Sequence, residues 1–505
     1  MVEEELQMIK LKNMEDEDED EDEITFGVWD YVCAPLNWLK MLANETHWSF
    51  VFGVVAVYGI SQGLGGSLIR VGTEYYMKDV QKVQPSEAQI YQGVTSIPWM
   101  VKPLWGLMTD VIPMFGYHRR PYFMVAGVLG MIPMLFLSFH KRLHIFFAVL
   151  SLTTGSTGAA IADVTVDACV AQNSNKHKHL AADMQSLCSL SSSTGSLLGF
   201  FLSGLLVHLI GPKGLYGLLT IPSALVFLIG TILDEPRTTS ASCKQVRQKL
   251  LDAASVMWST MKMPEVWQPC LYMYLSLALS LNVYDGMFYW YTDSDAGPAF
   301  SQEFVGYILS VGSAGALMGS LLFQYALKDH PFRDLCFWSQ LSLGLSGMLD
   351  LMLVLRLNLK IGVPDHFFAV IDEFALQFIG RLKWMPFLVL SAKLCPPGIE
   401  GTFFALIMSI DNIGVFTSSW FGGILLHVLK ITRTSFDNLW MAILIRNIAR
   451  FCPLLFIFLI PRTDSNSFIL PSLESNTTKE TERVETREGD NIELVSLMTN
   501  VDTQK

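Results

Sequence analysis

Twelve apolar runs separated by polar loops organise this chain. Crossing about 30 Å of hydrocarbon takes roughly 20 helical residues, and runs of that kind begin near Phe50, Ala88, Tyr122, Ile145, Leu180, Leu215, Val266, Phe304, Leu335, Phe367, Thr402 and Leu439. The runs lack the alternation of barrel strands, and a backbone in lipid must satisfy its own hydrogen bonds. The pattern therefore predicts an all-α integral membrane protein with twelve transmembrane helices in two six-helix halves.

The polar stretches divide the chain into five segments. We expect an acidic cytoplasmic tail over residues 1–48, a first half over 49–233, a cytoplasmic linker over 234–265, a second half over 266–461 and a polar cytoplasmic tail over 462–505. The linker carries five lysine and arginine residues, and basic loops tend to remain in the cytosol. This charge bias places both ends of the chain on the cytoplasmic side.

Composition supports a location in the bilayer. Apolar residues make up 51% of the chain, and the net charge of −12 arises largely from twelve acids within residues 1–23 and nine within 462–505. The acidity therefore describes the two tails, and we expect no nucleic acid, metal or other cofactor as a partner. No clear transit peptide precedes the acidic run, so the sequence does not indicate which membrane holds the protein. No nucleotide-binding G-x-x-x-x-G-K-[ST] loop occurs either, which argues against direct ATP hydrolysis.

The stretch Ile97–Tyr122 combines a lysine in an apolar span with a charged loop. Its Gly106, Asp110, Gly116, Arg119 and Arg120 resemble the loop between the second and third helices of major facilitator superfamily proteins. Compared with the usual G-x-x-x-D-x-x-G-R-[KR] pattern, three extra residues precede the second glycine and two more precede the arginines. The pairs Pro98-Trp99 and Lys102-Pro103, with the triplet Arg119-Arg120-Pro121, resemble the folate-biopterin transporter branch specifically.

Two further features extend this resemblance along the chain. Gly319 precedes Arg333 by fourteen residues, as Gly106 precedes Arg120, and internal repeats of this kind are typical of transporters. The stretch from Cys395 to Thr402 is similar to the family's junction between the tenth and eleventh helices. The resemblance implies the major facilitator fold, alternating access, and folates or pterins as substrates. Carriage of another organic anion remains an alternative.

Two acids lie on the predicted fourth helix. Asp163 and Asp167 are four residues apart and share one helix face. We expect Asp167 to reach Arg119 or Arg120 and, with Asp110, to form a gating latch on the cytoplasmic side. Asp163 lies one turn deeper, where desolvation favours proton exchange, and is the predicted proton-coupling residue. Either acid is as likely to be a structural clamp as a substrate-binding group, and Asp163 is the one predicted to bind substrate.

Candidate ligand-binding residues come from both halves. Lys102 is placed to hold an anion or simply to neutralise Asp163. Arg381 occupies the place in the second half that matches Asp163 in the first, if the two helix junctions correspond. Asp285 lies among aromatic residues, of which Tyr284 and Phe288 are the candidates for stacking on a pterin ring. In this arrangement Asp285 meets ring donors, and Lys102 or Arg381 meets the glutamate carboxylates of a folate.

Further ionisable groups in apolar runs are Arg70, Glu74, Asp372, Glu373, Asp411, Arg446 and Arg450. For Arg446 and Arg450, pairing with acids on a neighbouring helix is the preferred interpretation.

Two rival functions use some of the same residues. The Asp163 and Asp167 pair matches a D-x-x-x-D motif that holds Mg²⁺ against a diphosphate in a prenyltransferase. No second acid pair with that spacing occurs in the other half, which weakens this alternative. A transporter-like receptor that signals through its acidic tails is the other alternative.

Overall fold

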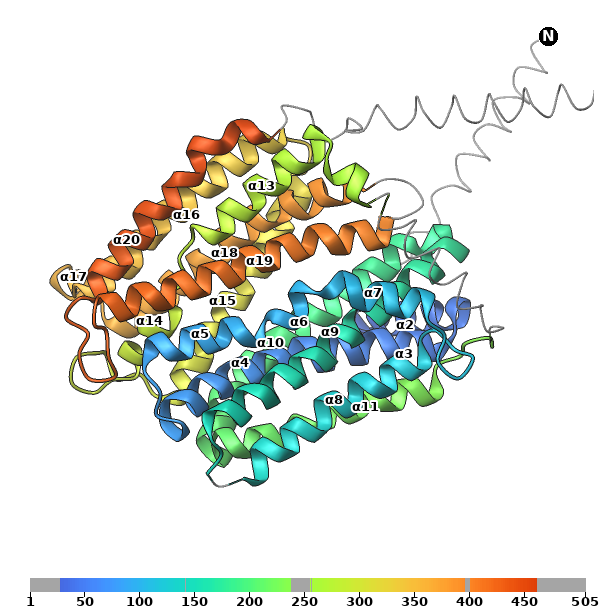
Figure 1. Cartoon of the computed structure of the whole chain (residues 1–505), viewed down its shortest axis with the longest axis horizontal. Helices are drawn as coiled ribbons and strands as arrows, with labels where there is room; N and C mark the ends of the chain where they lie inside the picture. The colour runs from blue at the N-terminus through green and yellow to red at the C-terminus, as the bar shows by residue number, and fades with distance from the viewer. Residues whose placement is uncertain (1–27, 141, 238–254, 256, 396–399, 461–505) are drawn as a thin grey trace, which may run out of the picture. The chain divides into compact units, whose positions relative to one another are not determined.

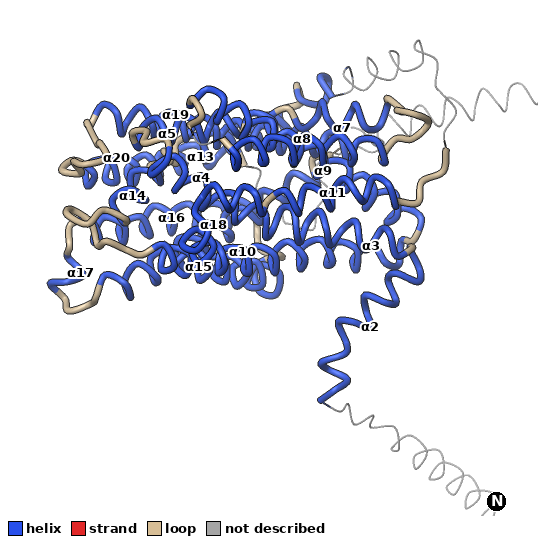
Figure 2. Tube along the Cα trace, turned by 90° about the horizontal axis from the view of Figure 1, so that it is seen from below, coloured by secondary structure: helices blue, strands red, loops and turns tan. Residues whose placement is uncertain are grey.

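The computed structural model describes residues 28–140, 142–237, 255, 257–395 and 400–460. Over these residues all of the extended regular structure is helical (Figure 2), apart from an isolated bridge between Met114 and Tyr117. The chain forms two units, residues 1–51 and 52–505, and the second contains both predicted halves. The acidic run of residues 15–23, most of the linker and the tail from residue 462 onward lie outside the described residues.

The first unit contains α2 (Val28–Thr46), a helix that the sequence interpretation had left inside the acidic tail. The next helix, α3, crosses the boundary between the units. The elements of the first half are α3 (Trp48–Val54), η1 (Val55–Leu64), α4 (Gly65–Tyr75), η2 (Tyr76–Val80), α5 (Pro85–Thr95), α6 (Ile97–Met100), α7 (Lys102–Val111), α8 (Arg120–Phe139), α9 (Ile145–Lys176), η3 (Lys178–Leu180), α10 (Ala181–Leu218) and α11 (Thr220–Ile232).

The second half continues after the partly described linker. Its elements are α13 (Pro264–Ala278), α14 (Tyr284–Tyr291), α15 (Gln302–Leu322), η4 (Phe323–Leu327), α16 (Phe332–Val354), α17 (Leu357–Lys360), α18 (Asp365–Lys393), α19 (Glu400–Val428), α20 (Leu439–Phe451) and η5 (Cys452–Leu459). The helices begin close to the apolar runs expected from the sequence.

Eight helical stretches among the described residues are long and apolar enough to cross a membrane. One of them, Asp183–Ile232, contains 50 residues, and at 1.5 Å per residue its length of about 75 Å exceeds twice the hydrocarbon thickness. Gly211 breaks this stretch with a φ of 69°, and Pro212 follows. Two crossings therefore fit this stretch, whereas the total of twelve transmembrane helices remains a prediction.

Prolines divide the segment between residues 85 and 111 into three short helices. Pro98 and Pro103 each lie in the first turn of a new helix, where the missing N–H costs nothing. The segment runs beside α19 of the second half (Figure 1), and α10 packs against α15 in the same way. Large apolar side chains such as Ile132, Leu209 and Trp338 are more than 60% exposed, which is expected for helix faces in contact with lipid.

The spacing repeat between the halves has a structural counterpart. Arg120, at the start of α8, donates to the carbonyl oxygens of Gly230 and Thr231 near the end of α11. Arg333, at the start of α16, donates to those of Phe458 and Ile460 at the end of η5. Each arginine thus supplies donors to the final carbonyls of the last helix in its half, where a cation also interacts favourably with the helix dipole.

Candidate functional site

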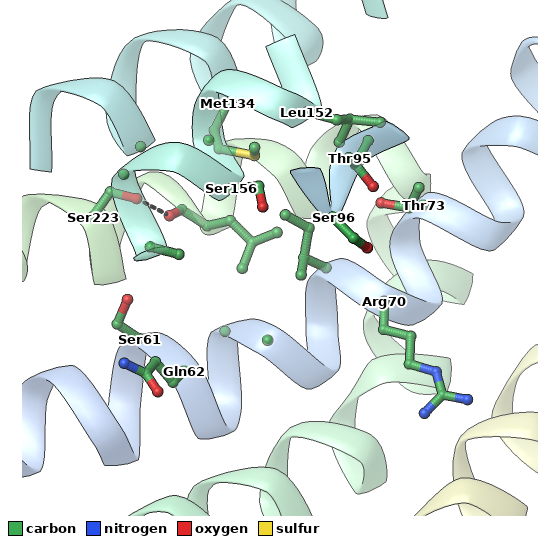
Figure 3. A pocket seen from close by; sticks show the side chains of 18 of the residues that line it. Ser61, Gln62, Arg70, Thr73, Thr95, Ser96, Met134, Leu152, Ser156 and Ser223 are labelled. Atoms are coloured by element: carbon green, nitrogen blue, oxygen red, sulfur yellow. Dashed lines mark hydrogen bonds between the residues drawn. The ribbon is translucent and has the colours of Figure 1, made fainter. Parts of the chain in front are cut away.

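A cavity of about 380 Å³ lies within the first half, and Asp285 of the second half completes its wall. Its lining comes from η1, α4, η2, α5, α6, α8, α9 and α11, and is rich in glycine, alanine and aliphatic residues. Polar side chains that face the same space (Figure 3) include Ser61, Gln62, Thr73, Thr95, Ser96 and Ser156. Small residues make room for a flat ligand, and scattered hydroxyl and amide groups give it hydrogen-bonding partners.

Glu74 and Asp285 form the acidic part of this cavity wall. They are 5% and 4% exposed, and both oxygens of Glu74 and the Oδ2 atom of Asp285 are buried without a hydrogen-bond partner among the described residues. Arg70 lies beside them, with its Nε atom 3.6 Å from Glu74 Oε1. Buried acceptors normally have donors, so these oxygens suit a ligand that presents N–H groups.

A second cavity of about 210 Å³ lies between the halves and shares Arg70 with the first. Its wall combines α10 with α15 and α18, and its charged residues are Arg70, Glu373 and Arg381. Glu373 accepts a hydrogen bond of 2.7 Å from Gln377, whereas Arg381 donates to the Ser320 hydroxyl at 2.8 Å. The larger cavity therefore has an acidic wall, and the smaller one contains two guanidinium groups.

Lys102 and the two acids of α9 form a cluster behind the larger cavity. The Lys102 ammonium forms ion pairs with both Asp163 and Asp167, at 3.3 Å in the case of Asp167. Gln62, which lines the cavity, donates to Asp163 at 2.9 Å, and Tyr58 donates to Asp167. Both donors come from the π-helical η1, a type of helix that is frequent at functional sites. Lys102 thus neutralises Asp163, as one of the two sequence interpretations held.

The expected latch between Asp167 and Arg119 or Arg120 is wrong in the partner of Asp167. Asp167 pairs with Lys102, and Arg119 instead pairs with Asp110 at 2.7 Å. Sequence spacing placed Asp163 and Asp167 on one helix face, but it carried no information on which neighbouring side chain reaches that face. Lys102 lines neither cavity, so its predicted contact with a ligand stays a prediction. Tyr58 and Gln62 were missed because polar residues in an apolar helix are common.

The loop before α8 is held together within the first half. Arg119 also donates to the Thr109 hydroxyl at 3.1 Å, and the Glu235 carboxylate accepts from the backbone N–H groups of residues 118–120. Gly116 has a φ of 82°, a conformation that favours glycine, whereas a Cβ added at Gly106 would only make ordinary contact with Val164 of α9, at 3.4 Å. These contacts stiffen one end of the first half and do not themselves join the two halves.

The aromatic candidates have different surroundings. The Tyr284 ring lies 4.9 Å from the guanidinium of Arg70, a residue that lines both cavities, but Tyr284 itself lines neither. Phe288 is 1% exposed and packs edge-to-face on Tyr75 at 5.0 Å. Phe288 lines neither cavity, so its predicted stacking on a ligand does not match its position in the packed core.

Other buried ionisable groups of the second half lie away from the cavities and differ in their partners. Arg446 of α20 forms an ion pair of 2.5 Å with Asp350 of α16, and Asn447 donates to the Gly347 carbonyl at 2.6 Å. This confirms the expectation that Arg446 pairs with an acid on a neighbouring helix. Arg450 forms no ion pair among the described residues, contrary to the expectation that it pairs with an acid on a neighbouring helix. The buried Lys383 donates to the Ser276 carbonyl at 3.0 Å. Asp350 and Lys383 were missed because each occurs singly in an apolar run.

The two halves contact each other at the end that carries the loops after η2, α14 and α19. Tyr289 donates to the Val83 carbonyl at 3.1 Å, and Arg433 reaches the carbonyls of Lys78 and Val83. Lys78 in turn donates to Thr292. Between described residues of the two halves, the other hydrogen bonds lie at this end or halfway along the helices, as in Asn412 to Trp99 at 3.1 Å. This end is called the sealed end below.

Comparison with known proteins places this arrangement in a group of carriers. A family model described as the BT1 family matches residues 62–483. The protein "Probable folate-biopterin transporter 2" of Arabidopsis thaliana is 61% identical over 471 residues, which cover 93% of this chain and 94% of that protein. The "Folate-biopterin transporter" of Synechocystis sp. is 30% identical, with 87% of this chain and 86% of that protein covered.

A solved structure supports the fold independently. The nucleoside transporter NupG matches with a TM-score of 0.62 at 12% identity, covering 82% of this chain and 100% of that one. An identity this low bears on the fold alone. The match confirms the predicted all-helical major facilitator fold, with the number of crossings left open.

Proposed function

The chain belongs to the BT1 family, and from this premise we propose that it carries folates or pterins across a membrane by alternating access. It is a multi-pass integral membrane protein, and its relatives are named as transporters and not as enzymes. The prenyltransferase alternative is thereby set aside. The Lys102 ammonium, which pairs with both Asp163 and Asp167, also occupies the position that this alternative assigned to Mg²⁺.

One observation supports the substrate class most directly. Glu74 and Asp285 line the larger cavity, and both oxygens of Glu74 and Oδ2 of Asp285 are buried without hydrogen-bond partners among the described residues. A pteridine ring presents adjacent N–H donors on one edge, which match the two oxygens of a carboxylate. Its flat faces suit a narrow cavity whose wall includes the rings of Tyr91 and Trp99.

Uptake into proteoliposomes tests this proposal. We expect the full-length protein to take up folate and biopterin in preference to a nucleoside, a sugar or an amino acid. Glu74→Gln keeps the side-chain size and removes the charge, and should reduce uptake of both substrates at least about tenfold, because a charge-assisted hydrogen bond contributes about 1.5–3 kcal/mol. Glu265→Gln, on the exposed start of α13, is the matched control. Uptake of other organic anions without folate or biopterin would reject the substrate assignment.

We further propose that transport is driven by protons and that Asp163 is the coupling residue. Its carboxylate lies between Lys102 and the cavity-lining Gln62, so protonation would release the ammonium toward Asp167. Asp163→Asn should impair proton-driven uptake more than exchange between preloaded compartments, since exchange does not require the return of an empty carrier. Equal losses in the two assays would remove Asp163 from the coupling step.

We propose that Gly106, Asp110, Gly116, Arg119 and Arg120 act in gating as a rigid end of the first half. The Arg119 pair with Asp110 and the Glu235 contacts make this end move as one body. Asp167 would contribute separately, through its shared cation Lys102. With cytoplasmic termini, the sealed end faces away from the cytosol, and the structure corresponds to an inward-facing carrier.

A further inference from the structure

We infer that the smaller cavity binds the glutamate carboxylates of a folate while the pteridine ring occupies the larger cavity. Arg381, together with Arg70, then distinguishes folates from uncharged pterins. This inference rests on the proposed function and adds a division of the substrate between two subsites.

The pairing of the charged groups favours an anion in the smaller cavity. Arg381 carries five N–H donors, and in the described part of the chain it donates to the Ser320 hydroxyl and forms no ion pair. The charge of Arg70 is only loosely matched by Glu74, at 3.6 Å. A cation held within a membrane protein is costly unless it is paired or has a function, and a ligand carboxylate would pair with Arg381.

The acid in this cavity is already engaged by the chain. Glu373 accepts from Gln377 and packs so closely on α15 that a Cβ at Gly312 would lie 2.8 Å from its Cγ atom. Its position is therefore fixed, and one of its acceptor oxygens is in use. The lining thus carries two guanidinium groups against one carboxylate, which leaves one positive charge for a ligand carboxylate to pair with.

Hydroxyl groups surround the guanidinium groups. Ser192, Ser193 and Ser196 line the cavity from α10, and Ser313 lines it from α15. Serine hydroxyls donate to carboxylate oxygens and impose little size restriction. The apolar residues Phe200, Leu309, Ala316 and Leu317 complete the lining. The apolar stem of a carboxylate chain and its charged end therefore both find partners in this cavity.

Arg70 connects the two subsites because it lines both cavities. A ligand whose ring meets Glu74 and Asp285 can pass Arg70 and extend its acidic end toward Arg381. The volumes of about 380 and 210 Å³ are together typical of a site for a drug-sized molecule. A folate would use both cavities, whereas biopterin would use only the larger one.

Paired uptake assays on the full-length protein test this division. Arg381→Gln should lower the kcat/KM of folate uptake about 10- to 100-fold, the loss expected for one charged hydrogen-bonding partner, and leave biopterin uptake within about twofold. Arg381→Lys keeps the charge and should recover part of the folate uptake. Lys360→Gln, which removes an exposed charge of α17 away from both cavities, is the matched control.

The uptake results test the anion subsite and the proposed function separately. A loss of folate uptake with biopterin uptake retained supports the anion subsite. Equal losses for both substrates, or unchanged folate uptake, overturn it even when the wild-type protein transports both. Failure of the wild-type protein to transport either substrate rejects the proposed function instead. Retained biopterin uptake also shows that the variant is folded, and folate uptake by Arg381→Lys provides a second measurement. A folding defect therefore cannot be mistaken for loss of the subsite.

Discussion

At the scale of single residues, the buried charges fall into two groups according to what faces them. Lys102 with Asp163, and Arg446 with Asp350, are matched inside the chain. Glu74 and Asp285 instead face a cavity. An ionised group in the membrane interior costs at least about 2.5–3.5 kcal/mol on insertion scales. The two ion pairs offset that cost within the chain. The cost of burying Glu74 and Asp285 instead calls for a functional explanation.

The Arg446 pair is therefore expected to act on stability more than on transport. Both side chains are buried, so Arg446→Met leaves Asp350 as a buried, unpaired charge, which typically costs about 3–5 kcal/mol. Replacing both residues, as Arg446→Met with Asp350→Leu, should recover much of the loss because neither partner of this ion pair is then left behind without the other. Thermal unfolding of the detergent-solubilised variants measures this, and a double variant no more stable than the single one would contradict it.

At the scale of helices, close crossings depend on glycine at a few positions. Gly204 of α10 meets the start of α15 at the sealed end, where an added Cβ would lie 2.1 Å from the Gln302 carbonyl oxygen. The obstacle is backbone, so it cannot move aside by changing a rotamer. Glycine is therefore required at this position when the sealed end is closed. It is not required in a conformation in which α10 has separated from α15.

Gly204→Ala is consequently expected to disfavour the sealed end without destabilising α10 itself. Alanine is the better helix former by about 1 kcal/mol, so any loss must come from the contact with α15. Accessibility of single cysteines placed near Gln302 should rise toward a membrane-impermeant reagent. Gly380→Ala on α18, where nothing lies within 4 Å of the added Cβ, is the control. Equal accessibility in the two variants would argue against the steric role of Gly204.

The positions of the helices were predictable from the sequence, but the neighbours of each helix were not. Long apolar runs marked where helices begin, because the bilayer imposes one length on every crossing. The helix α2 was missed because its mixed composition was read together with the acidic run before it. The partner of Asp167 was missed because a helical period assigns a face to a side chain, but not the neighbour at that depth. The ligand cavity needs nine elements at once, and no local pattern reports their joint position.

At the scale of the whole membrane-embedded unit, alternating access requires contacts that hold one end shut and can be released. The sealed end has such contacts in Arg433, Lys78 and Tyr289, which join loops of the two halves. The Arg119 and Asp110 pair, in contrast, joins elements within one half. Loss of the contacts at the sealed end is therefore expected to change the balance between conformations directly. Loss of the Arg119 and Asp110 pair should change it only through the shape of the first half.

Removing Arg433 tests that balance. Arg433→Ala eliminates the donors to the Lys78 and Val83 carbonyls, and a net loss of about 1–3 kcal/mol would shift the ratio of the two conformations about 5- to 150-fold. Distances between spin labels on the α14–α15 and η2–α5 loops should lengthen, and cysteines near Arg381 should become less accessible from the opposite side. Lys430→Ala, in the same loop, controls for loss of charge. A carrier whose label distances stay the same in both variants would show that the sealed end is held by helix packing, with Arg433 contributing only to the order of the loop.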